Sequence, residues 1–114
     1  MLFLTTAHTF TKELRNDNVM IGKLIVNYCY GMYQSERAVL TELDTSRISL
    51  ASLVTMDVPK QLGWHMRGFM KLGGTRQELT KTLEIAKTIV DITGVSLQHS
   101  LPDIEETINA AKLV

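Results

Sequence analysis

The stretch from Thr75 to Gly94 constrains the fold most strongly, because its residues predict both ends of one long helix. Thr75 and Glu78 have the spacing of a capping box, in which each side chain accepts a hydrogen bond from the backbone of the other residue. Gly94 can adopt the left-handed conformation in which helices commonly end. Between these ends apolar residues recur at helical spacing in two rows, one of Leu79, Leu83, Ala86 and Val90 and one of Ile85, Ile89 and Ile92.

The same helical period runs through nearly all of the chain, and no segment alternates as a strand would. The predicted helices cover residues 19–33, 35–43, 47–56, 58–72, 75–93 and 103–114. Residues 44–46 are expected to cap the third helix, and Asp57 is expected to cap the fourth with Pro59 just inside it. Because a chain of this length can bury one core, we expect an all-α bundle of about six helices in a single domain, residues 1–114.

Charge and cysteine content exclude several classes of function. Twelve basic residues balance twelve acidic ones, so no broad face for nucleic acid is expected. Cys29 is the single cysteine of the sequence, which excludes an intramolecular disulfide and a C-x-x-C zinc or dithiol motif. We therefore expect no metal, no cofactor and an intracellular, cytoplasmic location.

Two segments bear on targeting and membranes. The apolar run 19–33 is shorter than the roughly 20 residues that span a bilayer, so no membrane association is expected. The first ten residues lack the basic start of a signal peptide. Ala111, Lys112 and Leu113 are similar to a peroxisomal targeting tripeptide, but Val114 follows them. A peroxisomal or mitochondrial location is the alternative to the cytoplasm.

The predicted helix 58–72 carries the residues best suited to chemistry. His65 lies on its flank, with Gln61 one turn earlier, between an apolar face and a polar face. The apolar face consists of Val58, Leu62, Met66 and Phe69, and the opposite face of Lys60, Trp64, Arg67 and Lys71. His65 either transfers a proton or only forms a hydrogen bond within a helix interface. Gly63 and Gly68 each cost about 1 kcal/mol inside a helix, which indicates the close approach of another backbone or a ligand.

Trp64, among three basic side chains, has two interpretations. It is either a surface ring shielded by a cation–π contact or the anchor of a subunit interface, where tryptophan and arginine are enriched. The interface is favoured, because the run 19–33 is apolar on nearly every side and exceeds what a small monomer can hide. A homo-oligomer is therefore expected. Cys29 lies within that run and is expected to be buried and inert.

The segment from Asp57 to Leu79 resembles the carboxymuconolactone decarboxylase family of the alkylhydroperoxidase D-like (AhpD-like) superfamily, and most closely its divergent fungal-type members. The family pattern has a histidine in a helix, then a glycine, then a Thr-x-x-Glu start to a helix that ends near a glycine. This pattern is matched in order by His65, Gly74, Thr75, Glu78 and Gly94. The resemblance extends over about residues 43–94.

The resemblance implies an all-helical fold, assembly into trimers or hexamers, and a pocket lined by the helix that carries His65. Val58 and Gln61 occupy the positions of the paired cysteines in the peroxidase branch, so no thiol peroxidase activity is expected. Ile48 lies where many members have an acid that relays protons. Glu42 or Asp44 would have to replace that acid.

Two functions follow. The first is a cofactor-free decarboxylase or lactone-type lyase for a small-molecule substrate, with His65 as the proton-transfer group. Gln61 would assist His65, and Arg67 and Trp64 would bind the substrate. The second is a non-catalytic oligomeric module that binds a small molecule or a protein. The retained His65 favours the first function, and the missing acid and thiols favour the second.

Overall fold

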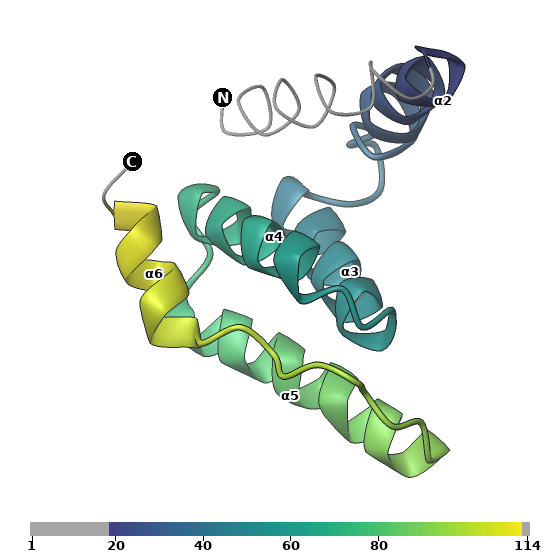
Figure 1. Cartoon of the computed structure of the whole chain (residues 1–114). Coiled ribbons are helices and arrows are strands. Elements are labelled where there is room, and N and C mark those ends of the chain that lie inside the picture. Colours follow the sequence, from purple (N-terminus) through teal and green to yellow (C-terminus); the bar gives the residue numbers. More distant parts are fainter. Residues whose placement is uncertain (1–18, 113–114) are drawn as a thin grey trace. The chain divides into compact units, whose positions relative to one another are not determined.

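The structure is a computed structural model of the chain, and it describes residues 19–112 (Figure 1). Across these residues the chain is helical and contains no strand, which confirms the all-α class. It has five helices when the continuous α2 and η1 are counted as one, against the predicted six. Contacts group the chain into two units, Met1–Glu42 and Leu43–Val114, so the single domain stays a prediction.

The described residues of the first unit include an apolar helix. The α-helix α2 (Val19–Lys23) continues directly into the π-helix η1 (Leu24–Tyr33), so the predicted range 19–33 is helical throughout. At its end the N–H of Gln34 donates to the carbonyl of Cys29 at 3.0 Å, five residues earlier, as in a π-helix. No residue of η1 is buried, and Cys29 is half-buried rather than buried as expected.

The predicted helix 35–43 is wrong, because the residues up to Thr41 form turns and bends. Local side chains supply the hydrogen bonds that a helix would need. The Ser35 hydroxyl donates to the Gly31 carbonyl at 2.5 Å, and the Glu36 carboxylate accepts from the N–H of Ala38 at 2.6 Å. The Arg37 guanidinium also donates to nearby carbonyls. Such bonds compete with helical ones, which leaves a connecting loop in place of a helix.

The second unit holds the other four helices, which are α3 (Glu42–Thr55), α4 (Pro59–Lys71), α5 (Arg76–Thr93) and α6 (Ile104–Lys112). The cap predicted at residues 44–46 is wrong, because α3 already begins at Glu42. Asp44 instead pairs with Arg47 one turn later at 2.8 Å. Asp103 caps α6 by accepting from the N–H of Glu106 at 2.7 Å, and the predicted end of this helix at 113–114 lies outside the described residues.

The ends of α5 are as predicted. The Thr75 hydroxyl accepts from the N–H of Glu78, the Glu78 carboxylate accepts from the N–H of Thr75, and Gly94 is left-handed.

The start of α4 differs from the prediction, because the N-cap residue is Val58 and the Asp57 side chain does not cap the helix. Asp57 has a φ of 57°, and Pro59 begins the helix as expected. Asp57 is therefore free to bind elsewhere.

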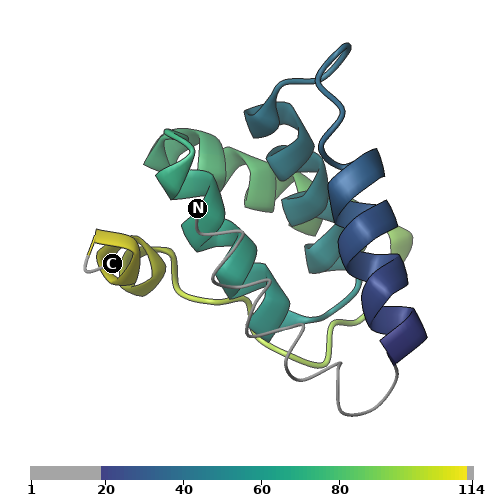
Figure 2. The same ribbon diagram turned by 90° about the horizontal axis from the view of Figure 1, so that it is seen from above.

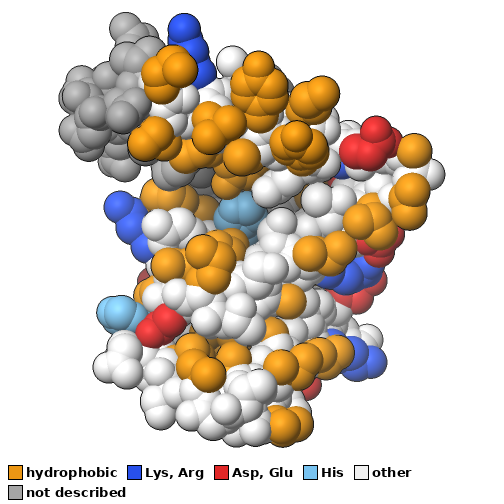
Figure 3. All heavy atoms as spheres, turned by 90° about the vertical axis from the view of Figure 1, so that its right-hand side faces the viewer, with side chains coloured by type: hydrophobic (Ala, Val, Ile, Leu, Met, Phe, Trp, Pro, Cys, Tyr) orange, Lys and Arg blue, Asp and Glu red, His pale blue; other side chains and the backbone are white. Residues whose placement is uncertain are grey.

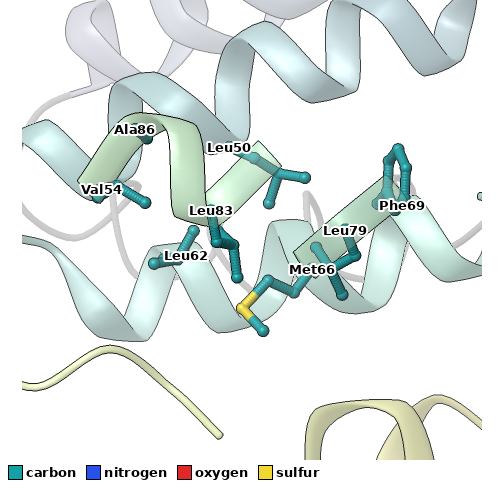
Figure 4. Packing of buried hydrophobic residues seen from close by; sticks show 8 residues of the cluster. All are labelled: Leu50, Val54, Leu62, Met66, Phe69, Leu79, Leu83 and Ala86. Carbon is teal, nitrogen blue, oxygen red and sulfur yellow. The ribbon is translucent and has the colours of Figure 1, made fainter. Parts of the chain in front are cut away.

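The core of the second unit lies among α3, α4 and α5, and Figure 4 shows its side chains meeting from the three helices. The buried cluster consists of Leu50, Val54, Leu62, Met66, Phe69, Leu79, Leu83 and Ala86. The segment between α5 and α6 returns past the start of α4 (Figure 2), and its Leu97 and Leu101 cover the cluster. The apolar face predicted for α4 is thus buried, except that Val58 is only half-buried. Of the two apolar rows predicted for α5, the one that begins at Leu79 is buried and the one that begins at Ile85 is exposed.

Candidate functional site

His65 occupies the flank of α4 that the sequence predicts. The residue is half-buried, one position before the buried Met66. Burial lowers the pKa of His65 below its ordinary value of 6.5, because desolvation disfavours the imidazolium. The imidazole is therefore neutral at pH 7, the form in which a histidine can accept a proton.

The other candidate residues of α4 lie on different sides of the helix. Gln61 is half-buried one turn before His65, on the same flank. Trp64 and Arg67 lie on the face opposite the core, where the Lys60 ammonium is 5.2 Å from the centre of the Trp64 ring. This cation–π contact fits the shielded-ring interpretation of Trp64. The helix thus brings Gln61 close to His65 and turns Trp64 and Arg67 toward another side.

The two glycines of α4 have different surroundings. A Cβ atom at Gly63 would lie 3.9 Å from the Pro102 ring, so the segment before α6 passes close to the helix there, as expected. A Cβ atom at Gly68 would meet nothing within 4 Å, so no described backbone segment approaches this residue, and the approach of a ligand there stays a prediction.

Four of the five residues that carry the family resemblance shape helix boundaries. Thr75 and Glu78 form the capping box, Gly94 ends α5, and a Cβ atom at Gly74 would overlap the ring of Phe69. These local roles account for the spacing without any catalysis. Of the five residues, His65 and Glu78 carry groups suited to acid–base chemistry, and the Glu78 carboxylate is engaged in the capping box and with Arg47.

The carboxylates near the core take part in structural contacts. Arg47 links Asp44 to Glu78, at 2.8 Å and 2.6 Å, and stacks 5.9 Å from the centre of the Phe69 ring. Hydrogen bonds from Thr75, with the charge of Arg47 adding to them, lower the pKa of Glu78. Glu42 pairs with Arg37 at 3.5 Å. The acids proposed to complete a proton relay with His65 thus have other partners.

Asp57 forms a contact that the sequence analysis missed. Its carboxylate accepts from the N–H groups of Gln98 and His99, at 2.6 Å and 3.2 Å, and lies 3.3 Å from the His99 ring nitrogen. These groups, the Gln98 N–H first, lower the pKa of Asp57. Asp57 thereby ties the turn before α4 to the segment after α5. No sequence signal identifies this partner 41 residues away.

The described part of the chain meets the requirements of neither a metal site nor a membrane-spanning helix. Between residues 19 and 112 no three His, Cys, Asp or Glu side chains lie close enough together to hold a metal ion. Over the same range, every helix is too short or too polar to cross a bilayer.

Large apolar side chains remain exposed on both units. On α5 the row formed by Ile85, Ile89 and Ile92 is 63%, 53% and 80% exposed, and we call it the isoleucine row. On α2 and η1 the exposed large apolar residues are Met20, Ile21, Leu24, Tyr28, Met32 and Tyr33. Figure 3 shows hydrophobic side chains gathered over this helix. Since monomers seldom expose contiguous apolar patches of this kind, both surfaces are candidate contact sites.

Comparison with known proteins gives one informative match. Models of known protein families do not match the sequence, and neither does any solved structure. Peroxisomal protein 2 of Schizosaccharomyces pombe (strain 972 / ATCC 24843) is 26% identical over 90 residues. The match covers 79% of this chain but only 42% of that protein, so the chain spans less than half the length of its relative.

Proposed function

We propose that this chain is a non-catalytic helical module of the peroxisome that associates with copies of itself. The observation that carries the proposal is the isoleucine row, which the fold leaves exposed on a helix whose two ends are capped. At 100° per residue the row lies about 120° around α5 from the buried row of Leu79, Leu83, Ala86 and Val90. It is therefore a second apolar face that this core does not use.

The spacing of the isoleucine row suits contact with another helix. Ile85, Ile89 and Ile92 are separated by four and three residues, the spacing of the apolar seam along which helices of a coiled coil meet. Burying such side chains is worth about 1.5–3 kcal/mol each, so a symmetric contact that covers six of them would be favourable. The exposed apolar residues of α2 and η1 supply a second surface for assembly, which would allow a trimer or hexamer.

The structural contacts of the acidic side chains favour the non-catalytic module over an enzyme. Asp44, Asp57, Glu42 and Glu78 are each engaged in an ion pair, a cap or a backbone hydrogen bond. A proton relay through His65 needs a group that can change its protonation without breaking the fold, and these acids have structural partners. The location is proposed from the relative named Peroxisomal protein 2.

The assembly is tested by measuring the mass of the full chain with light scattering at micromolar concentration. We expect an oligomer, and we expect Ile89→Glu to reduce it to a smaller species because a buried charge disrupts an apolar contact. Ile48→Glu is the matched control, since Ile48 on α3 is 54% exposed and Ile89 is 53% exposed. A monomeric wild-type chain, or equal loss of mass in both variants, would refute the proposal.

The location is tested separately. A fusion with a fluorescent protein at the amino end should coincide with a peroxisomal marker in yeast cells. Diffuse fluorescence through the cytoplasm would contradict the peroxisomal part of the proposal and leave the assembly part to the mass measurement.

The second candidate is a cofactor-free lyase similar to carboxymuconolactone decarboxylase, and the lowered pKa of His65 favours it. A neutral, half-buried imidazole next to Gln61 could take a proton from a carbon beside a carbonyl group. Proton transfer by a positioned histidine contributes about 10²–10⁴-fold to a rate. Because Glu42 and Asp44 pair with arginines, such an enzyme would need an activated substrate such as a carboxylactone or a β-keto acid.

The lyase is tested by assaying these two substrate classes for release of carbon dioxide. Turnover that His65→Gln abolishes and His99→Gln preserves would establish it, because the control removes an imidazole from the loop outside α4. The rate should rise with pH as His65 loses its proton. Turnover that survives His65→Gln, in a variant that remains folded by circular dichroism, would exclude His65 as the catalytic group.

A further inference from the structure

A basic ridge runs along the outer side of α4. Lys60, Trp64, Arg67 and Lys71 are spaced by four, three and four residues, so their side chains follow one line along the helix. This line, which we call the α4 ridge, lies opposite the buried side chains Leu62, Met66 and Phe69. It runs over the twelve residues from Lys60 to Lys71, which corresponds to about 16 Å of helix.

The cations of the α4 ridge are unpaired within the described part of the chain. Among residues 19–112, Lys60, Arg67 and Lys71 form no ion pair, whereas Arg37, Arg47, Arg76 and Lys87 each pair with a carboxylate. The ridge therefore concentrates three positive charges that the described part of the fold leaves uncompensated. Because the whole chain has a formal net charge of zero, this charge is a local feature of one helix face.

Trp64 gives the α4 ridge an anchor. The residue is half-buried, and the Lys60 ammonium lies 5.2 Å from the centre of its ring. Tryptophan and arginine supply much of the binding energy where proteins meet. The indole N–H and the three cations are all hydrogen-bond donors and none is an acceptor, so the chemistry that fits the ridge is a row of carboxylates.

We propose that the α4 ridge binds an acidic helical segment of another protein, with carboxylates facing Lys60, Arg67 and Lys71 and an apolar side chain against Trp64. The charge count favours a protein segment over other polyanions. Recognition of anionic lipid typically uses four to eight clustered basic residues, and salt-sensitive binding of duplex DNA uses about 6–10 phosphate contacts. Three cations at helical spacing instead match carboxylates at the same spacing on a second helix.

The probe is a fluorescent peptide of about 18 residues, long enough to be helical, made of Glu, Leu and Ala with Glu at ridge spacing. The matched peptide has Gln in place of every Glu. The chain of 114 residues should bind the Glu peptide and not the Gln peptide, and binding should weaken as salt shortens the range of the attraction. Equal binding of both peptides would overturn the proposal, and so would no binding of either.

Variants then place the site. Lys60→Gln, Arg67→Gln and Lys71→Gln together should weaken binding roughly tenfold, as expected for three exposed ion pairs. The control is Lys81→Gln, Lys87→Gln and Lys112→Gln, which removes the same charge from α5 and α6. Equal loss in both triple variants would refute the site. Ridge-dependent binding of phosphatidylserine vesicles or duplex DNA without binding of the Glu peptide would replace the protein partner with that polyanion.

Discussion

The carboxylate of Asp57 accepts a hydrogen bond from the backbone N–H of Gln98 at 2.6 Å, across 41 positions of sequence. The bond joins the turn before α4 to the segment between α5 and α6. That segment places Leu97 and Leu101 over the core, so Asp57 helps to keep the buried cluster covered.

Removing the Asp57 carboxylate should loosen this segment. Asp57→Gly suits the φ of 57° but lacks the acceptor, so we expect faster hydrogen exchange at the N–H groups of Gln98 and His99 and a lower melting temperature. Asp57→Asn keeps one acceptor oxygen and should show a smaller effect. Exchange rates that do not change in Asp57→Gly would show that the bond contributes nothing.

The same contact makes the fold sensitive to acid. Because the folded pKa of Asp57 is lowered from 3.8, its contribution to the free energy of unfolding is complete above that value. It is lost as the pH falls through the lower folded pKa. Denaturant titrations between pH 5 and pH 2 should therefore show a steeper loss of stability for the wild type than for Asp57→Asn.

His65 should destabilise the fold in mild acid. The unfolded chain binds a proton on this histidine near pH 6.5, whereas burial lowers the folded pKa, so the unfolded state binds more protons between the two values. Stability should be constant above about pH 7 and should fall as the pH drops below 6.5. His65→Gln should flatten this part of the profile, and an unchanged profile would show that His65 titrates as it does in the unfolded chain.

Replacement of Gly68 and of Gly74 by alanine should change the free energy of unfolding in opposite directions. Gly68→Ala adds a methyl group to open space in the middle of α4 and should stabilise the fold by about 0.5–1 kcal/mol. Gly74→Ala places a methyl group where the Phe69 ring lies and should cost about 1–3 kcal/mol. Urea unfolding measures both. Equal effects of the two changes would contradict the difference in their surroundings.

The Thr75 hydroxyl of the capping box should contribute more to the free energy of unfolding than the hydroxyl of a threonine in the middle of α5. Thr75→Ala removes the acceptor of the Glu78 N–H and should cost about 1 kcal/mol in urea unfolding. Thr88→Ala is the control, because Thr88 is exposed in the middle of the helix and donates only to the Glu84 carbonyl. Alanine there should be neutral or slightly stabilising. A larger cost at Thr88 than at Thr75 would contradict the role of the box.

Sequence reasoning identified α5 and the side of α4 that carries His65, because both depend on neighbours within one or two turns. It failed at residues 35–43, where the hydroxyl of Ser35 and the guanidinium of Arg37 take backbone partners that a helical period does not reveal. It also assigned Asp57 to a cap, because the local pattern before Pro59 is that of a helix start.

The sequence by itself determined the helical class, the capping box of α5 and the two apolar rows of that helix, since these follow from short-range hydrogen bonds and side-chain spacing. Only the tertiary structure decided which of the two apolar rows of α5 is covered, where the Asp57 carboxylate binds and how far His65 is desolvated. These properties depend on which helix faces meet, and residues 41 positions apart meet only after the chain has folded.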